Sequence, residues 1–259
     1  MTTATLAAPT AGPIGFGRVL QSTVDALKAN LWAYVALVAI FGAIPAGVGA
    51  WIINAWAHGG AAGDQSALLG ATYVVGGIER IVSYPMIGGV TAGVLAQFKG
   101  QRLSFQTYLS KGLGLWGGLF GLNFLVGLRV GLGLLLLIVP GVIWSIMWVV
   151  ATPAKVAEDR SISRAISRSA ELTKGRRWSV FGFVLLLGVS YFIIHFLAGF
   201  IAQLAVTLAP SAVAVRYVMT GAAQLVISPF AIAAMTCLYQ ELRTMRGGGA
   251  PDEVANVFT

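Results

Sequence analysis

Long apolar runs separated by short charged segments dominate the chain. The first uncharged run covers residues 31–56 and, at about 1.5 Å per helical residue, is long enough to cross a hydrocarbon core of about 30 Å. Four later runs lie at about 113–137, 139–157, 179–204 and 217–238. The run from Ser66 to Gln97 is too long for one straight crossing, so it must bend near Ser83-Tyr84-Pro85 or project out of the bilayer. The pattern therefore predicts six membrane spans, the first kinked by Pro45.

Two segments outside these runs have the period of an amphipathic helix. In residues 15–32 the apolar positions at helical spacing are Phe16, Val19, Leu20, Val24 and Leu27. In residues 158–178 one face carries Ile162, Ala165, Ile166, Ser169 and Leu172, and the opposite side carries Arg160, Arg164 and Arg168. Gly175 stands at the position of a helix C-cap, and Trp178 precedes the next span. Both segments are predicted to lie at the membrane surface.

Composition and charge fix the class and the orientation. Hydrophobic residues make up 57% of the 259 and charged residues only 10%, whereas soluble domains carry about 25% charged residues. Fourteen of the seventeen lysines and arginines fall in the N-terminal helix, the 99–111 and 155–177 connections and the C-terminal end. Because such cations stay preferentially on the cytoplasmic side, both termini are predicted to be cytoplasmic. This topology explains the excess of lysine and arginine over aspartate and glutamate, and no nucleic-acid partner is expected.

The sequence thus predicts an all-α integral membrane protein: a bundle of six transmembrane helices with amphipathic interfacial helices on the cytoplasmic side. Residues 14–245 would form this membrane domain. The small and polar segments 1–13 and 246–259 are expected to be disordered tails. The N-terminus lacks the basic region and short apolar stretch of a secretory signal, so the first span would act as an uncleaved anchor.

A few polar residues fall within the predicted spans. Rise per residue places them in the middle or outer part of the membrane: Glu79, Arg80, Asn123, Arg129, His195, Gln203 and Gln224. They could line an outward-opening polar crevice. Alternatively, the arginines extend to outer headgroups and the amides hydrogen-bond between helices. Glycines on the third span, Gly114, Gly118, Gly121, Gly127 and Gly131, predict packing seams within the bundle or, alternatively, a dimer interface.

No constellation for catalysis or metal binding is evident. The chain has one cysteine, Cys237, and two histidines, His58 and His195, that are far apart, so no metal site and no cofactor are expected. The neighbouring carboxylates Glu158 and Asp159 point in different directions on a helix and form no acid/base pair by themselves. Glu158 is instead predicted to pair with Arg176 or Arg177 across the connection, with Glu158–Arg176 as the inner polar pair.

The region around this connection resembles a bacterial protein family. The residues that carry the resemblance are Pro140-Gly141-Val142-Ile143-Trp144, Pro153, Glu158, Ala165-Ile166-Ser167-Arg168-Ser169 and Glu171-Leu172-Thr173-Lys174-Gly175-Arg176-Arg177-Trp178. They are similar to the membrane domain of glycerophosphoryl diester phosphodiesterase and to related six-span proteins of uncharacterised function. Looser similarity extends over residues 14–245, including the entry helix from Phe16 to Trp32.

The resemblance implies a multi-pass protein of the bacterial cytoplasmic membrane. In some relatives this unit precedes a phosphodiesterase barrel. The chain ends soon after the sixth predicted span, so we expect no such catalytic domain, and none of its active-site residues is carried over.

The sequence is compatible with three alternative functions. The first is a non-enzymatic membrane protein that engages anionic lipid headgroups or a membrane protein partner through a basic surface: Arg160, Arg164, Arg168, Lys174, Arg176, Arg177 and Trp178. The second is a small transporter or pore that uses the outer polar residues. The third is a membrane-embedded lipid enzyme that depends on Glu158 or His195. The sequence leaves the oligomeric state open.

Overall fold

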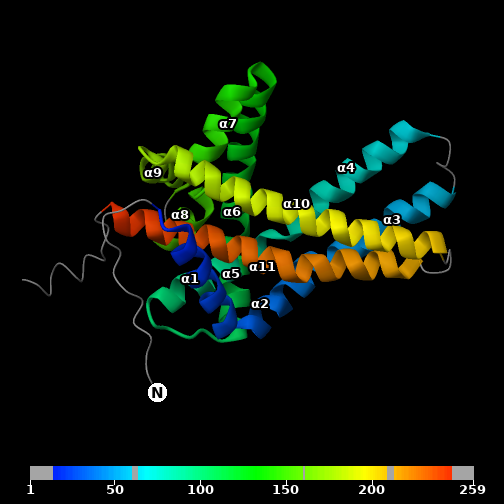
Figure 1. Cartoon of the computed structure of the whole chain (residues 1–259), viewed down its shortest axis with the longest axis horizontal. Coiled ribbons are helices and arrows are strands. Elements are labelled where there is room, and N and C mark those ends of the chain that lie inside the picture. The colour runs from blue at the N-terminus through cyan, green and yellow to red at the C-terminus, as the bar shows by residue number, and fades with distance from the viewer. Residues whose placement is uncertain (1–13, 60–63, 160, 209–212, 247–259) are drawn as a thin grey trace, which may run out of the picture.

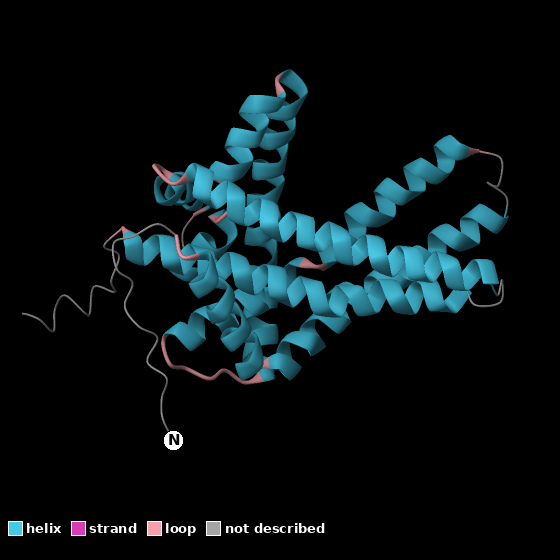
Figure 2. Ribbon diagram, viewed as in Figure 1, coloured by secondary structure: helices cyan, strands magenta, loops and turns pink. Residues whose placement is uncertain are grey.

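The computed structural model describes residues 14–59, 64–159, 161–208 and 213–246, and these residues form helices without strands (Figure 1, Figure 2). Six of the helical stretches described are long and apolar enough to cross a membrane. The predicted all-α membrane fold is therefore confirmed. The predicted tails, 1–13 and 246–259, lie outside the described residues except for Arg246.

The N-terminal helix and the first span form as predicted. They comprise α1 (Phe16–Ala29), α2 (Leu31–Val38), the π-helical turn η1 (Ala39–Ala43) and α3 (Ile44–Gly59). The π-helical turn ends two residues before Pro45, whose ring nitrogen cannot donate the hydrogen bond that a regular α-helix needs there. The predicted irregularity at Pro45 thus takes the form of a widened turn.

The long second run is divided into two helices. They are α4 (Gln65–Val82) and α5 (Tyr84–Phe98), and the break at Ser83 lies where the sequence predicts a bend. Among its described residues α4 buries none; it packs against α3, and its start diverges from α10 and α11 in Figure 1. The span's most apolar window is 67% buried, against 11% for the fifth span. Because these buried residues lie on α5, this helix is the centre of the core.

The third and fourth spans form a hairpin. It consists of α6 (Phe105–Leu136), α7 (Ile138–Met147) and, after a break at residues 148–150, α8 (Ala151–Glu158). Then follow α9 (Ile162–Thr173), α10 (Arg177–Leu208) and α11 (Val213–Met245). The last two run side by side along the long axis of the molecule, and the tip of the α6–α7 hairpin projects away from them (Figure 1).

Close backbone approach joins α5 to α6. A Cβ atom on Gly112 would collide with the carbonyl oxygen of Pro85, and one on Gly89 would lie 2.9 Å from the carbonyl oxygen of Tyr108. The predicted glycine seam on the third span divides in two. Gly118 and Gly121 pack against Lys155 and Ile162, whereas Gly114, Gly127 and Gly131 face open space.

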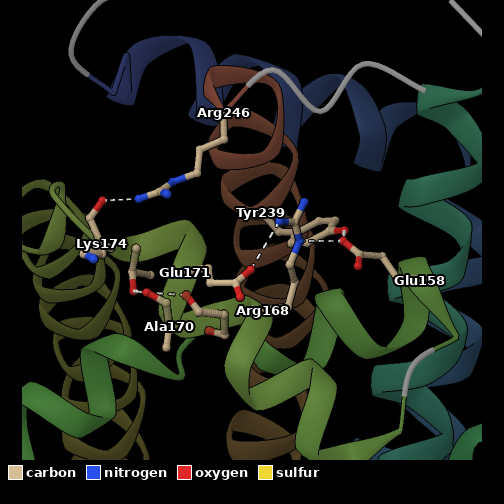
Figure 3. A network of polar contacts seen from close by, with 9 residues as sticks. Glu158, Arg168, Ala170, Glu171, Lys174, Tyr239 and Arg246 are labelled. Atoms are coloured by element: carbon tan, nitrogen blue, oxygen red, sulfur yellow. Dashed lines mark hydrogen bonds and ion pairs between the residues drawn. The ribbon is translucent and has the colours of Figure 1, made fainter. Parts of the chain in front are cut away.

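Three surface segments meet at one end of the molecule. Helix α1 packs along α11, and the Arg18 guanidinium pairs with the Glu241 carboxylate at 2.8 Å. The Phe16 ring also contacts Phe183 of α10, with ring centroids 5.6 Å apart. At the same end Arg246 donates a hydrogen bond to the backbone carbonyl of Lys174 (Figure 3). This end holds the charged groups from which the candidate site is built.

Candidate functional site

A polar cluster joins α8, α9 and α11 at this end; we call it the Glu158 cluster and define it as Glu158, Arg168 and Tyr239. Arg168 Nε donates to Glu158 Oε1 at 3.1 Å, and the Tyr239 hydroxyl donates to the same oxygen at 2.7 Å (Figure 3). Arg168 Nη1 also lies 3.5 Å from Glu171 Oε2, one turn further along α9. The cluster therefore ties three helices that are distant in sequence.

Local chain geometry brings α9 onto α8. Asp159, the residue after α8, adopts a left-handed conformation with φ 43°. This conformation ends α8 and lets the following segment reverse direction, so that α9 packs against α8. The Ser169 hydroxyl then donates to the carbonyl of Met147 at 2.8 Å, at the end of α7. This hydrogen bond satisfies a carbonyl that the break between α7 and α8 would leave without a helical partner. Ser169 is thus a buried anchor of α9.

One face of α9 is buried against the bundle. Ala165, Ile166, Ser169 and Leu172 are buried as predicted, and Thr173 joins them. Arg164 on the opposite side is exposed. Gly175 ends the segment with φ +83°, a conformation that a residue with a side chain rarely adopts, and α10 begins two residues later.

Arg168 differs from its predicted place. It lies at the edge of the buried face, about 100° around the helix from the middle of that face, and so it reaches the bundle instead of the lipid surface. Its side chain is only 23% exposed, and that of Glu158 is 11% exposed. Burial opposes the charged form, but the hydrogen bond and the negative charge of Glu158 outweigh it and raise the pKa of the Arg168 guanidinium. Arg168 is a structural cation.

The structure pairs Glu158 with Arg168, whereas the expected pair of Glu158 with Arg176 stays a prediction. Arg168 reaches Glu158 because α9 runs beside α8, and Arg176 follows the Gly175 turn and leads into α10. Tyr239 was missed because a tyrosine near the end of an apolar span is usually interpreted as an interfacial residue. Its one-turn spacing from Leu242 and Met235 on the core side of α11 was the available signal.

The remaining cations form an exposed patch, which we call the basic surface: Arg164, Lys174, Arg176, Arg177 and Trp178. Arg164, Lys174 and Arg177 are exposed, Arg176 is half-buried, and the Trp178 ring is 85% exposed. Arg164 Nε donates to the Ser161 hydroxyl at the start of α9, 3.1 Å away. Arg160, predicted to belong to this surface, lies outside the described residues. An exposed tryptophan beside several cations is typical of a helix end at a membrane interface.

The outer polar residues make separate local contacts. The Glu79 carboxylate lies against Gly49 of α3, Asn123 donates to the Thr152 hydroxyl of α8 at 3.4 Å, and the Arg129 guanidinium lies over the Trp148 ring. His195 stacks near Tyr191, Gln224 lies near Gly42, and Arg80 and Gln203 are exposed. Within the described part of the chain no hydrogen bond or ion pair joins one of these seven side chains to another. The polar crevice stays a prediction.

The search for catalytic groups gives no cluster of metal ligands. Among the described residues no three histidine, cysteine, aspartate or glutamate side chains are grouped so that they could hold a metal ion. Cys237 is buried in the core and lies on α11, the helix that carries Tyr239.

The helices define an all-α integral membrane protein with six candidate spans. Residues 123–247 match the family model described as the membrane domain of glycerophosphoryl diester phosphodiesterase. This region runs from the middle of α6 to the end of α11, so it contains the Glu158 cluster and the basic surface. The resemblance seen around residues 140–178 is confirmed, and the looser similarity before residue 123 lies outside the match. No curated protein and no solved structure matches the chain.

Proposed function

We propose that this protein is a non-enzymatic component of the bacterial cytoplasmic membrane that engages anionic lipid headgroups through the basic surface. The observation that carries the proposal is Trp178, 85% exposed at the start of the fifth candidate span and directly preceded by Arg176 and Arg177. A tryptophan at this place sits at headgroup level, and each cation near an anionic surface contributes about 1 kcal/mol.

The Glu158 cluster supports the proposal by holding α9 in place. The buried face of α9 and the Arg168–Glu158 pair fix one side of the helix on the bundle, which leaves Arg164 and Lys174 on the exposed side. A fixed helix presents its cations to phosphates without first losing conformational freedom. The same arrangement supports cytoplasmic termini as part of the proposal, because α1, α9 and the end of α11 carry lysines and arginines at one end of the molecule.

The test removes the exposed cations and keeps the structural one. A variant carrying Arg164→Gln, Arg176→Gln and Arg177→Gln is purified with its surrounding lipid in polymer-bounded particles, and the anionic fraction of that lipid is measured. We expect the enrichment in anionic lipid seen with the unchanged chain to fall by several-fold. Arg80→Gln with Arg129→Gln provides a control with cations removed elsewhere. Equal enrichment in all three proteins, each inserted normally, would refute the proposal.

A further inference from the structure

A groove at the junction of α1 and α2 carries a further inference. An open groove of about 660 Å³ lies between the end of α1, the first turn of α2 and the connection that leads into α6. Its wall includes Lys28, Asn30, Leu31, Trp32, Leu103 and Phe105. None of these residues belongs to the basic surface or to the Glu158 cluster.

The groove lies where three candidate spans end or begin. The first starts at Leu31, the second ends at Phe98 and the third starts at Phe105. These positions place the groove at the level where the apolar part of the bilayer gives way to headgroups. Trp32, which is 85% exposed, is the kind of residue found at that level.

The wall of the groove has a polar and an apolar part. Lys28 is exposed at the end of α1, and the next polar residue along the wall is Asn30, whose side-chain amide nitrogen is buried. Leu31 and Phe105 are 49% and 39% exposed and supply apolar surface together with Trp32. No acidic residue lines the groove. Its chemistry therefore complements a molecule with a negative head and an apolar chain.

The start of α2 adds to the positive character of the polar part. Asn30 precedes this helix without a side-chain capping bond, and the first backbone N–H bonded to it is that of Tyr34. The N–H groups of the first turn thus carry the partial positive charge of a helix N-terminus beside Lys28.

We propose that this groove binds one anionic phospholipid, with its phosphate at Lys28 and Asn30 and an acyl chain across Leu31, Trp32 and Phe105. The groove opens at the bilayer boundary, where phospholipid is the surrounding medium, and its charge complements a phosphate. The site does not depend on the basic surface, so each of the two proposals can fail without the other.

The experiment is native mass spectrometry of the full chain with phosphatidylglycerol and phosphatidylcholine of identical acyl chains. We expect one phosphatidylglycerol to stay bound preferentially, and Lys28→Gln to weaken that binding about fivefold, since it removes one cation near a phosphate. Trp32→Ala should reduce the retention of both lipids, because the chain contact is the same for each. The matched control is Arg80→Gln, an exposed cation on α4 that should leave binding unchanged.

Three results would overturn the proposal. The first is equal retention of phosphatidylglycerol by Lys28→Gln and the unchanged chain; Lys28 is exposed, so this variant should fold. The second is displacement by soluble glycerophosphate as effective as displacement by intact lipid, which would reduce the groove to a site for a free anion. The third is a lipid-free dimer that dissociates on Trp32→Ala, which would make the groove an interface between copies.

Discussion

Breaking the Glu158 cluster should loosen the packing of α9 and α11. Arg168→Gln removes a cation 3.1 Å from a carboxylate that is only 11% exposed. Breaking a fully buried ion pair costs about 3–5 kcal/mol, and because Arg168 keeps 23% of its side-chain surface exposed, we expect about 2–3 kcal/mol. Tyr239→Phe removes one hydrogen bond to a charged acceptor and should cost about 1.5–3 kcal/mol.

The single cysteine of the chain provides the assay. Cys237 is 2% exposed and lies on α11, two residues before Tyr239. A maleimide can reach its thiol only when this part of the bundle opens, so the labelling rate follows the opening equilibrium. A loss of 2 kcal/mol corresponds to about thirtyfold faster labelling at 25 °C.

The matched control is Arg164→Gln on the exposed side of the same helix. Arg164 bonds only the Ser161 hydroxyl among the described contacts, so its loss should change labelling by less than about threefold. If Arg168→Gln and Tyr239→Phe both label at the rate of Arg164→Gln, the cluster does not hold α9 and α11 together.

Three further predictions concern other parts of the fold. Gly112→Ala should destabilise the bundle by about 3 kcal/mol in thermal unfolding, because its Cβ would meet the Pro85 carbonyl, whereas Gly117→Ala faces open space and should be tolerated. The Arg18–Glu241 pair should show a coupling of only about 0.5 kcal/mol in a double-mutant cycle, weakened by salt, because Arg18 is 50% exposed. A hydrogen bond from Ser66 lowers the pKa of the Asp64 carboxylate, which caps α4. The cap therefore acts above the ordinary pKa and is lost as pH falls through the lowered one. The protection factor of the Ala67 amide, which compares its exchange with that of an unstructured peptide at the same pH, should fall in acid, and this fall should be absent in Asp64→Asn.

The membrane spans were predictable because a helix that crosses the hydrocarbon core needs a long run of uncharged, apolar residues. The bend near Ser83 followed from length alone, since the run from Ser66 to Gln97 exceeds a bilayer. The break between α7 and α8 had a signal that was not used. Residues 148–150 are Trp-Val-Val, but Pro153 in the first turn of α8 cannot donate the hydrogen bond to the Val149 carbonyl that a continuous helix needs. The hydrogen bond from Ser169 to the Met147 carbonyl, which comes from another helix, had no signal in the local sequence.

The candidate site was predictable in part for a similar reason. The helical spacing of apolar residues identified the buried face of α9, because residues three or four positions apart lie on the same side of a helix. It did not decide the place of Arg168, which lies at the border between buried and exposed positions, where a partner determines the direction of the side chain. That partner is Glu158, which accepts a hydrogen bond from Tyr239. Glu158 and Tyr239 are 81 positions apart, so no local sequence pattern links them.

The most direct test of the central claim measures which lipid lies beside Trp178. The six other tryptophans are replaced by phenylalanine, and the chain is placed in bilayers where bromine is carried by the chains of either phosphatidylglycerol or phosphatidylcholine alone. We predict that brominated phosphatidylglycerol quenches Trp178 fluorescence more strongly at equal content, and that Arg164→Gln, Arg176→Gln and Arg177→Gln together abolish the difference. Equal quenching by the two lipids with all three arginines present would contradict the engagement of anionic lipid by the basic surface.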